Sequence, residues 1–146
     1  MTMPVTDEQE ATLHAQLARK FDEYERLLNS MDPVAARTGY RTLVSAAFFT
    51  AAGERFPEGS PRADIIEYVA DVRARSGRTA EIDPVTAERL LLAVSTDEEI
   101  DDIDARISFQ TQGFLLAALI GDASLDGQQL DDFMARSRRL ADRWLA

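Results

Sequence analysis

The residues best suited to do chemistry in this sequence are the carboxylates of the segment 97–104, which reads DEEIDDID. Glu98 and Asp102 are four residues apart, so a helix would place them one turn apart on the same face. Carboxylate oxygens are ligands that magnesium prefers in proteins. Glu98, Glu99 and Asp102 are therefore candidate metal ligands, and a magnesium-dependent hydrolase is one hypothesis for the function.

Two classes of all-helical enzyme bind magnesium through carboxylates at helical spacing, the isoprenoid synthases and the nucleotide pyrophosphatases. The spacing of residues 101–104 (DDID) is one residue too short for the first class. The second class needs a facing pair of carboxylates, for which the chain offers only Asp22 with Glu25. Acidic residues at a helix start are also favourable by themselves, by about 0.3–1 kcal/mol each. A solvated helix start thus competes with the metal hypothesis.

Other metal and nucleophile chemistries find little support. Asp122, Ser124, Asp126 and Gly127 match the first half of a calcium-binding EF-hand loop, but Phe133 stands where the bidentate carboxylate is required. The chain has one histidine and no cysteine, which excludes disulfides, zinc fingers, iron–sulfur sites and thiol catalysis. It has no glycine-rich phosphate loop or nucleophile elbow. The sequence predicts no cofactor and a non-enzymatic protein.

A second set of candidates consists of Phe49, Gln110, Thr111 and Phe114. Gln110 lies three residues after Ile107 and four before Phe114, on what the spacing predicts to be the buried face of a helix. A buried amide without a partner costs about 1–3 kcal/mol, so it needs a hydrogen bond. A neighbouring backbone carbonyl, a dimer seam or a bound small ligand would each supply one.

Phe48 and Phe49 point about 100° apart on a helix, so one can fill a core while the other lies at its edge. We expect that edge to be a dimer surface. The small-ligand hypothesis instead makes Phe49 part of a pocket with Gln110, Thr111 and Phe114.

The elements that must position these residues are all helices. Apolar residues recur at spacings of three and four, and no run alternates with the period of a strand. Capping patterns at Thr6, Thr96 and Asp126 mark three helix starts. The sequence predicts an all-α single domain over 1–146, a bundle of about six helices without a sheet. The helices are expected at approximately 6–29, 33–56, 61–76, 84–95, 97–120 and 126–145.

The charge distribution narrows the range of partners. Sixteen basic and twenty-six acidic residues give a formal net charge of −10, which argues against nucleic acid as a partner. Residues 81–104 hold nine acidic residues and one arginine, so the acidic patch at 97–104 is a candidate site for a protein partner.

The location of the protein is inferred from its apolar runs. The longest unbroken run, 114–120, is too short to span a bilayer, and the first ten residues do not resemble a signal peptide. We therefore expect a cytoplasmic protein with no membrane partner. Two heavily apolar helices and the absence of a catalytic set favour a homodimeric interaction or regulatory module, with a small-ligand-binding domain as the first alternative.

Overall fold

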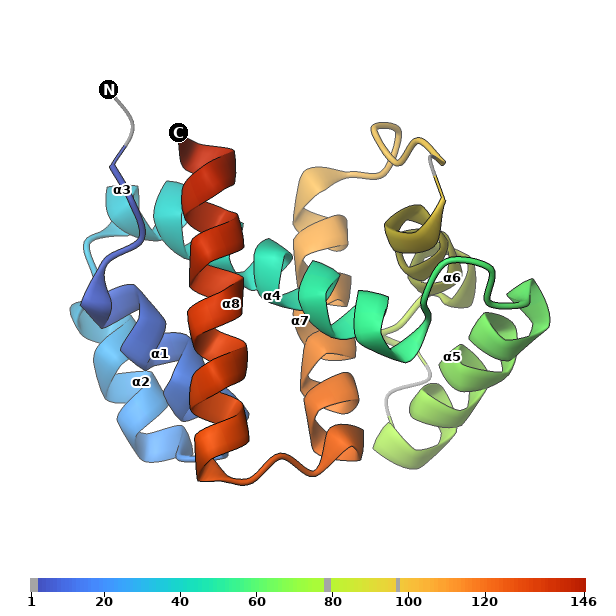
Figure 1. Cartoon of the computed structure of the whole chain (residues 1–146), viewed down its shortest axis with the longest axis horizontal. Coiled ribbons are helices and arrows are strands. Elements are labelled where there is room, and N and C mark those ends of the chain that lie inside the picture. Colours follow the sequence, from blue (N-terminus) through green and yellow to red (C-terminus); the bar gives the residue numbers. More distant parts are fainter. Residues whose placement is uncertain (1–2, 78–79, 97) are drawn as a thin grey trace. The chain divides into compact units, whose positions relative to one another are not determined.

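The computed structural model describes residues 3–77, 80–96 and 98–146, and all regular structure in these ranges is helical (Figure 1). The all-α prediction is therefore confirmed. None of the described helices is long and apolar enough to cross a membrane. Residue contacts group the chain into two compact units, Met1–Thr50 with Ile120–Ala146 and Ala51–Leu119. The boundaries between the units fall inside two helices, α4 and α7.

The first unit is built around its N-terminal helix. Its elements are α1 (Asp7–Leu17), α2 (Phe21–Ser30), α3 (Pro33–Ala35), the π-helical segment η1 (Ala36–Tyr40), most of α4 (Arg41–Arg55), the end of α7 (Ala105–Ala123) and α8 (Gly127–Leu145). Helix α1 packs against α2, η1 and α8, and Figure 1 shows α1 in blue beside α8 in red. Leu13 of α1 and Phe133 and Met134 of α8 are buried. These side chains form much of the core of this unit.

The second unit contains the remainder of α4 and of α7 together with α5 (Arg62–Ser76) and α6 (Pro84–Ser95). Helices α5 and α6 pack against each other. Phe56 and Tyr68 meet edge to face with 5.4 Å between ring centroids, and the Arg55 guanidinium lies 4.5 Å from the centroid of Phe56. The core of this unit is aliphatic apart from Phe56 and the largely buried Tyr68, and includes Ile65, Leu90, Leu91, Leu115 and Leu116.

The single helix predicted at 6–29 is wrong, because the chain breaks between α1 and α2. Arg19 adopts a left-handed conformation with φ 63°. The N–H of Arg19 donates to the Gln16 carbonyl and that of Lys20 to the Ala15 carbonyl, at 3.1 and 2.9 Å. This is the bonding of a Schellman motif, which usually places glycine where Arg19 stands. Because no glycine stands at this position, the break could not be predicted from the sequence.

The second predicted helix, 33–56, is helical but not uniformly α. The π-helical segment η1 ends at Tyr40, and Gly39 lies within it. A Cβ on Gly39 would lie 2.6 Å from both terminal atoms of the buried Gln9 side chain. Gln9 in turn belongs to the capping box of α1, in which its Oε1 accepts from the Thr6 N–H. Glycine therefore permits the close approach of this turn to the start of α1.

The helix predicted at 97–120 starts later than expected. Helix α7 begins at Ala105, and residues 98–104 form no helix. The Asp104 carboxylate accepts from the N–H groups of Arg106 and Ile107, so Asp104 caps the helix in place of Thr96. The Thr96 hydroxyl instead donates to the Leu92 carbonyl, at the end of α6. The capping-box prediction at Thr96 is therefore wrong, and Asp97 lies outside the described residues.

The predicted helices at 61–76, 84–95 and 126–145 have counterparts in α5, α6 and α8, whose bounds are given above. Side-chain hydrogen bonds cap two of these starts, and the one at Asp126 was predicted. Asp83 accepts from the Thr86 N–H ahead of Pro84, and Asp126 and Gln129 form a complete capping box. Local side-chain bonds thus fix these starts.

Candidate interaction surface

The predicted metal ligands lie in the second unit, in the non-helical stretch 98–104, which we call the acidic segment. Glu98, Glu99 and Asp102 are exposed. The helix that would have placed Glu98 and Asp102 one turn apart does not form there, so that premise of the magnesium hypothesis is wrong. Among the described residues, no group of three or more histidine, aspartate or glutamate side chains is placed to hold a metal ion.

Asp102 has a cationic partner from its own unit. Arg89 on α6 donates from Nη1 to Oδ2 at 2.9 Å and from Nη2 to Oδ1 at 2.7 Å. The same Nη2 donates to the Glu99 carbonyl at 3.0 Å. The hydrogen bonds from Arg89 hold the pKa of Asp102 below its usual value. This fork-like contact fixes the acidic segment against α6.

The expectation that Gln110 is buried is wrong. Gln110 is exposed on α7, as is Ile107, whereas Thr111 is buried and Phe114 is half-buried. The most buried positions of this helix are Thr111, Leu115, Leu116 and Leu119, a face rotated from the predicted one. After Gly113 the helix is apolar on nearly every side, so periodicity alone does not specify which side faces the core.

Phe49 belongs to the first unit, whereas Gln110, Thr111 and Phe114 belong to the second. Phe48 is buried at 4% exposure and Phe49 is 42% exposed, which confirms the expected division of the two rings between core and edge. The Phe49 ring meets Trp144 of α8 edge to face, with centroids 5.8 Å apart and planes at 86°. Trp144 is itself 47% exposed. The first unit therefore carries an aromatic pair, Phe49 with Trp144, that is about half accessible to water.

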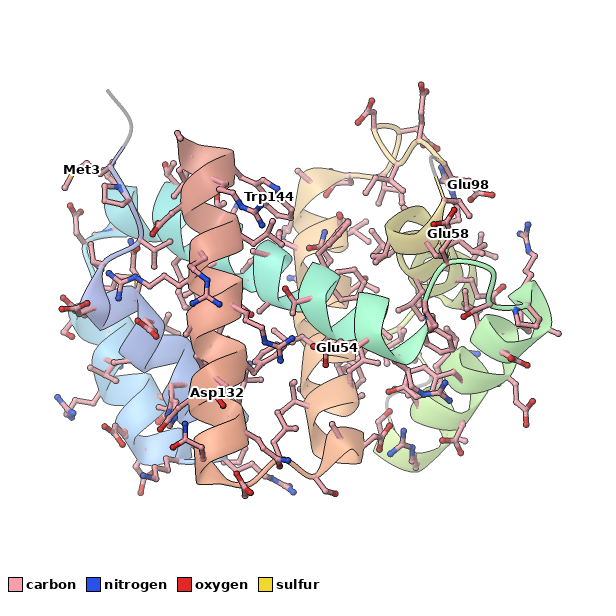
Figure 2. All side chains as sticks on the ribbon, in the orientation of Figure 1. Met3, Glu54, Glu58, Glu98, Asp132 and Trp144 are labelled. Atoms are coloured by element: carbon pink, nitrogen blue, oxygen red, sulfur yellow. The ribbon has the colours of Figure 1, made fainter. Side chains whose placement is uncertain are left out.

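A row of cations runs along α8 beside this pair. Arg136, Arg139 and Arg143 are spaced by three and four residues, so they share one side of the helix, and all three are exposed. We call them the arginine row. A shallow hollow next to it is lined by Leu125, Gln129, Asp132, Ala135, Arg136 and Arg139. Figure 2 labels Asp132 near the start of α8 and Trp144 near its end.

Three other charged residues of α8 contact α1 or the residues just before it. Arg138 donates from Nη1 to Asp7 and Glu10 and from Nη2 to the Val5 carbonyl. The Asp142 carboxylate accepts from the Val5 N–H at 2.7 Å. Asp131 Oδ1 lies 3.0 Å from Nε2 of His14, the lone histidine, whose role is thus to join α1 to α8. Asp131 and Asp142 are therefore engaged with the N-terminal part of the chain.

In the sequence, the four arginines of α8 give the helix a basic side, but three aspartates on the same helix are expected to offset their charge. The charges nearly cancel over the whole helix, but they do not cancel on each of its sides. Two of the aspartates and Arg138 lie on the α1 side, which leaves three arginines and Asp132 for the other side. The contacts of Val5 and His14 supply the information that the sequence lacked.

Comparison of the chain with protein-family models, with curated proteins and with solved structures gave no match in any of the three.

Proposed function

We propose that this chain is a non-enzymatic, cytoplasmic interaction or regulatory module that acts as a homodimer, with Phe49 and Trp144 in the contact surface. The observation that carries this proposal is the exposed aromatic pair. Aromatic residues and arginine are enriched in protein interfaces, where a few residues, often tryptophan, tyrosine or arginine, supply most of the binding energy. Here two rings and a row of arginines lie together on the first unit.

The geometry of the pair adds to this support. The edge-to-face contact restricts the rotation of both rings, so less side-chain entropy remains to be lost on association. Each ring still has nearly half of its surface in water, and burying that surface would stabilise a complex by about 25 cal/mol per Å².

The solution mass tests the proposal, measured by light scattering coupled to gel filtration. We expect a wild-type dimer that Phe49→Glu dissociates, because a carboxylate cannot be buried at the seam without a partner. Phe21→Glu is the matched control, since Phe21 belongs to the same unit and is 54% exposed, away from the Trp144 contact. It should leave the mass unchanged.

Trp144 provides a second readout, because it is the only tryptophan in the chain. Its emission should shift to the blue as the protein concentration rises and the indole leaves water. A wild-type monomer at all concentrations, with constant emission, would contradict the homodimer. The small-ligand alternative would then be tested by thermal shift, where a ligand at a hundred times its dissociation constant adds about 2.7 kcal/mol.

A further inference from the structure

We infer that the arginine row of one copy of this chain binds the acidic segment of a second copy. This inference rests on the proposed homodimer and names the two surfaces that meet in it. The first unit carries three arginines beside an exposed aromatic pair. The second unit carries a loop rich in carboxylates.

The charges of the two surfaces are complementary. Glu98, Glu99 and Asp101 are exposed, and residues 98–104 contain no basic residue. Asp102 and Asp104 are exposed as well, although they accept hydrogen bonds from Arg89 and from the first turn of α7, so the whole acidic segment is negatively charged. In a chain with a net charge of −10, a surface strip with an excess of cations is a specific place for such a segment to bind.

The apolar residues of the two surfaces also match. The arginine row borders Trp144 and Leu140 on α8, and Trp144 continues to Phe49. Within the acidic segment, Ile100 and Ile103 are half-buried, so part of each side chain remains accessible. Contact between these isoleucines and the aromatic pair would bury apolar area between the charge pairs, as in an interface with a hydrophobic centre and a charged rim.

Both surfaces are already ordered before they meet. The Arg89 fork to Asp102 and its bond to the Glu99 carbonyl hold the acidic segment. The segment also contains a turn in which the Ile103 N–H donates to the Ile100 carbonyl at 3.0 Å. The arginine row stands on a continuous 19-residue helix. Association therefore avoids much of the entropy cost of ordering a loop.

Symmetric contact of one arginine row with another is disfavoured. A two-fold dimer through α8 alone would bring two positive surfaces together, with one aspartate on each to offset three arginines. Exchange of acidic segments between two copies pairs opposite charges at both contacts. The second copy therefore contributes its acidic segment and not its own α8.

Charge reversal in pairs tests this inference. The row variant carries Arg139→Glu with Arg143→Glu, and the segment variant carries Glu98→Arg with Asp101→Arg. Each variant alone brings like charges together at both contacts, so each should be monomeric where the wild type is dimeric. We expect the dissociation constant to rise by about 100-fold or more, and the wild-type dimer to weaken as salt screens the charges.

Mixing the two variants in equal amounts is the decisive step. The reversed row of one variant then meets the reversed segment of the other, and the native row meets the native segment, so opposite charges face each other at both contacts. The dimer mass should return. Recovery would also show that both variants are folded, which circular dichroism of each variant checks independently.

The control variant is Lys20→Glu with Arg26→Glu, which alters net charge by the same amount as the row variant, on exposed residues of the same unit. It should remain dimeric. A row variant that stays dimeric, or a mixture that stays monomeric, would overturn the inference. If Phe49→Glu dissociates the dimer while the row variant does not, the proposed homodimer stands and the acidic segment is not its partner.

A wild-type monomer would remove both proposals together. Binding of a synthetic peptide of residues 96–106 to the arginine row of a monomer would likewise overturn the inference. The row would then bind an acidic segment of another protein and not that of a second copy.

Discussion

The two sides of α8 put the same residue types to different uses. On the side facing α1, Arg138, Asp131 and Asp142 each contact a group from the N-terminal part of the chain. On the other side, the arginine row lies exposed next to Trp144. A nearly neutral helix thus presents one face that holds the first unit together and one face with an excess of positive charge. The chemistry of a helix is decided face by face and not by its composition.

Arg138→Met should have the largest effect on stability and tests this contrast directly. The change removes the donor from the Asp7 and Glu10 carboxylates and from the Val5 carbonyl, and Arg138 and Glu10 are only partly exposed. We expect the free energy of unfolding, measured by urea denaturation, to fall by about 2 kcal/mol. Arg139→Met, one residue further on, should change it by less than about 0.5 kcal/mol. Equal losses would mean that the two sides do not differ.

Ser137→Ala tests the inward side with a smaller effect of opposite sign. Ser137 is fully buried, and among the described atoms its hydroxyl has no hydrogen-bond partner. Removing that hydroxyl should raise the free energy of unfolding by up to about 1 kcal/mol. The reverse change at the buried Ala141, one turn further along α8, should lower it by about the same amount. Thermal unfolding of Ser137→Ala and Ala141→Ser measures both, and two changes of the same sign would contradict the argument.

The ion pair of Arg89 with Asp102 lies outside α8, and we expect its removal to have the smallest effect on stability. Because Arg89 lowers the pKa of Asp102 in the folded state, the pair's contribution to stability is present above the unfolded pKa, near 4. It is lost as the pH falls through the lower folded pKa. An NMR titration of the Asp102 carboxyl should therefore show a midpoint below that of an unpaired aspartate. In Arg89→Met the midpoint should move up, and an unchanged midpoint would contradict the assignment.

The sequence predicted most of the helices because their starts depend on nearby residues. Thr6 with Gln9 and Asp126 with Gln129 form their capping boxes within four residues. Thr96 with Glu99 carries the same pattern and does not form one. There, Arg89 draws Asp102 and the Glu99 carbonyl toward α6, and Asp104 caps the helix instead. A tertiary contact from ten or more residues away outweighs the local motif, and no local pattern could reveal it.

The candidate surface was only partly predictable for a related reason. The angle between Phe48 and Phe49 follows from helix geometry, so one exposed ring could be expected. The partner ring, Trp144, lies 95 positions further along the chain, and its contact depends on how α4 and α8 pack. The predicted burial of Gln110 was wrong because an almost uniformly apolar helix does not specify its buried side.

The first unit is made from two separated stretches of chain, with Val5 bonded to both Arg138 and Asp142. At synthesis rates of about 5–20 residues per second, the last residue of α1 is added roughly 6–24 s before Arg138. The second unit is continuous, so its residues are all present before α8 exists. During translation, the N-terminal part of the first unit is therefore made first, but its packing is completed only after α8 has been made. Until then, α1 can pack against α2 and η1, and its side facing α8 stays uncovered by that helix.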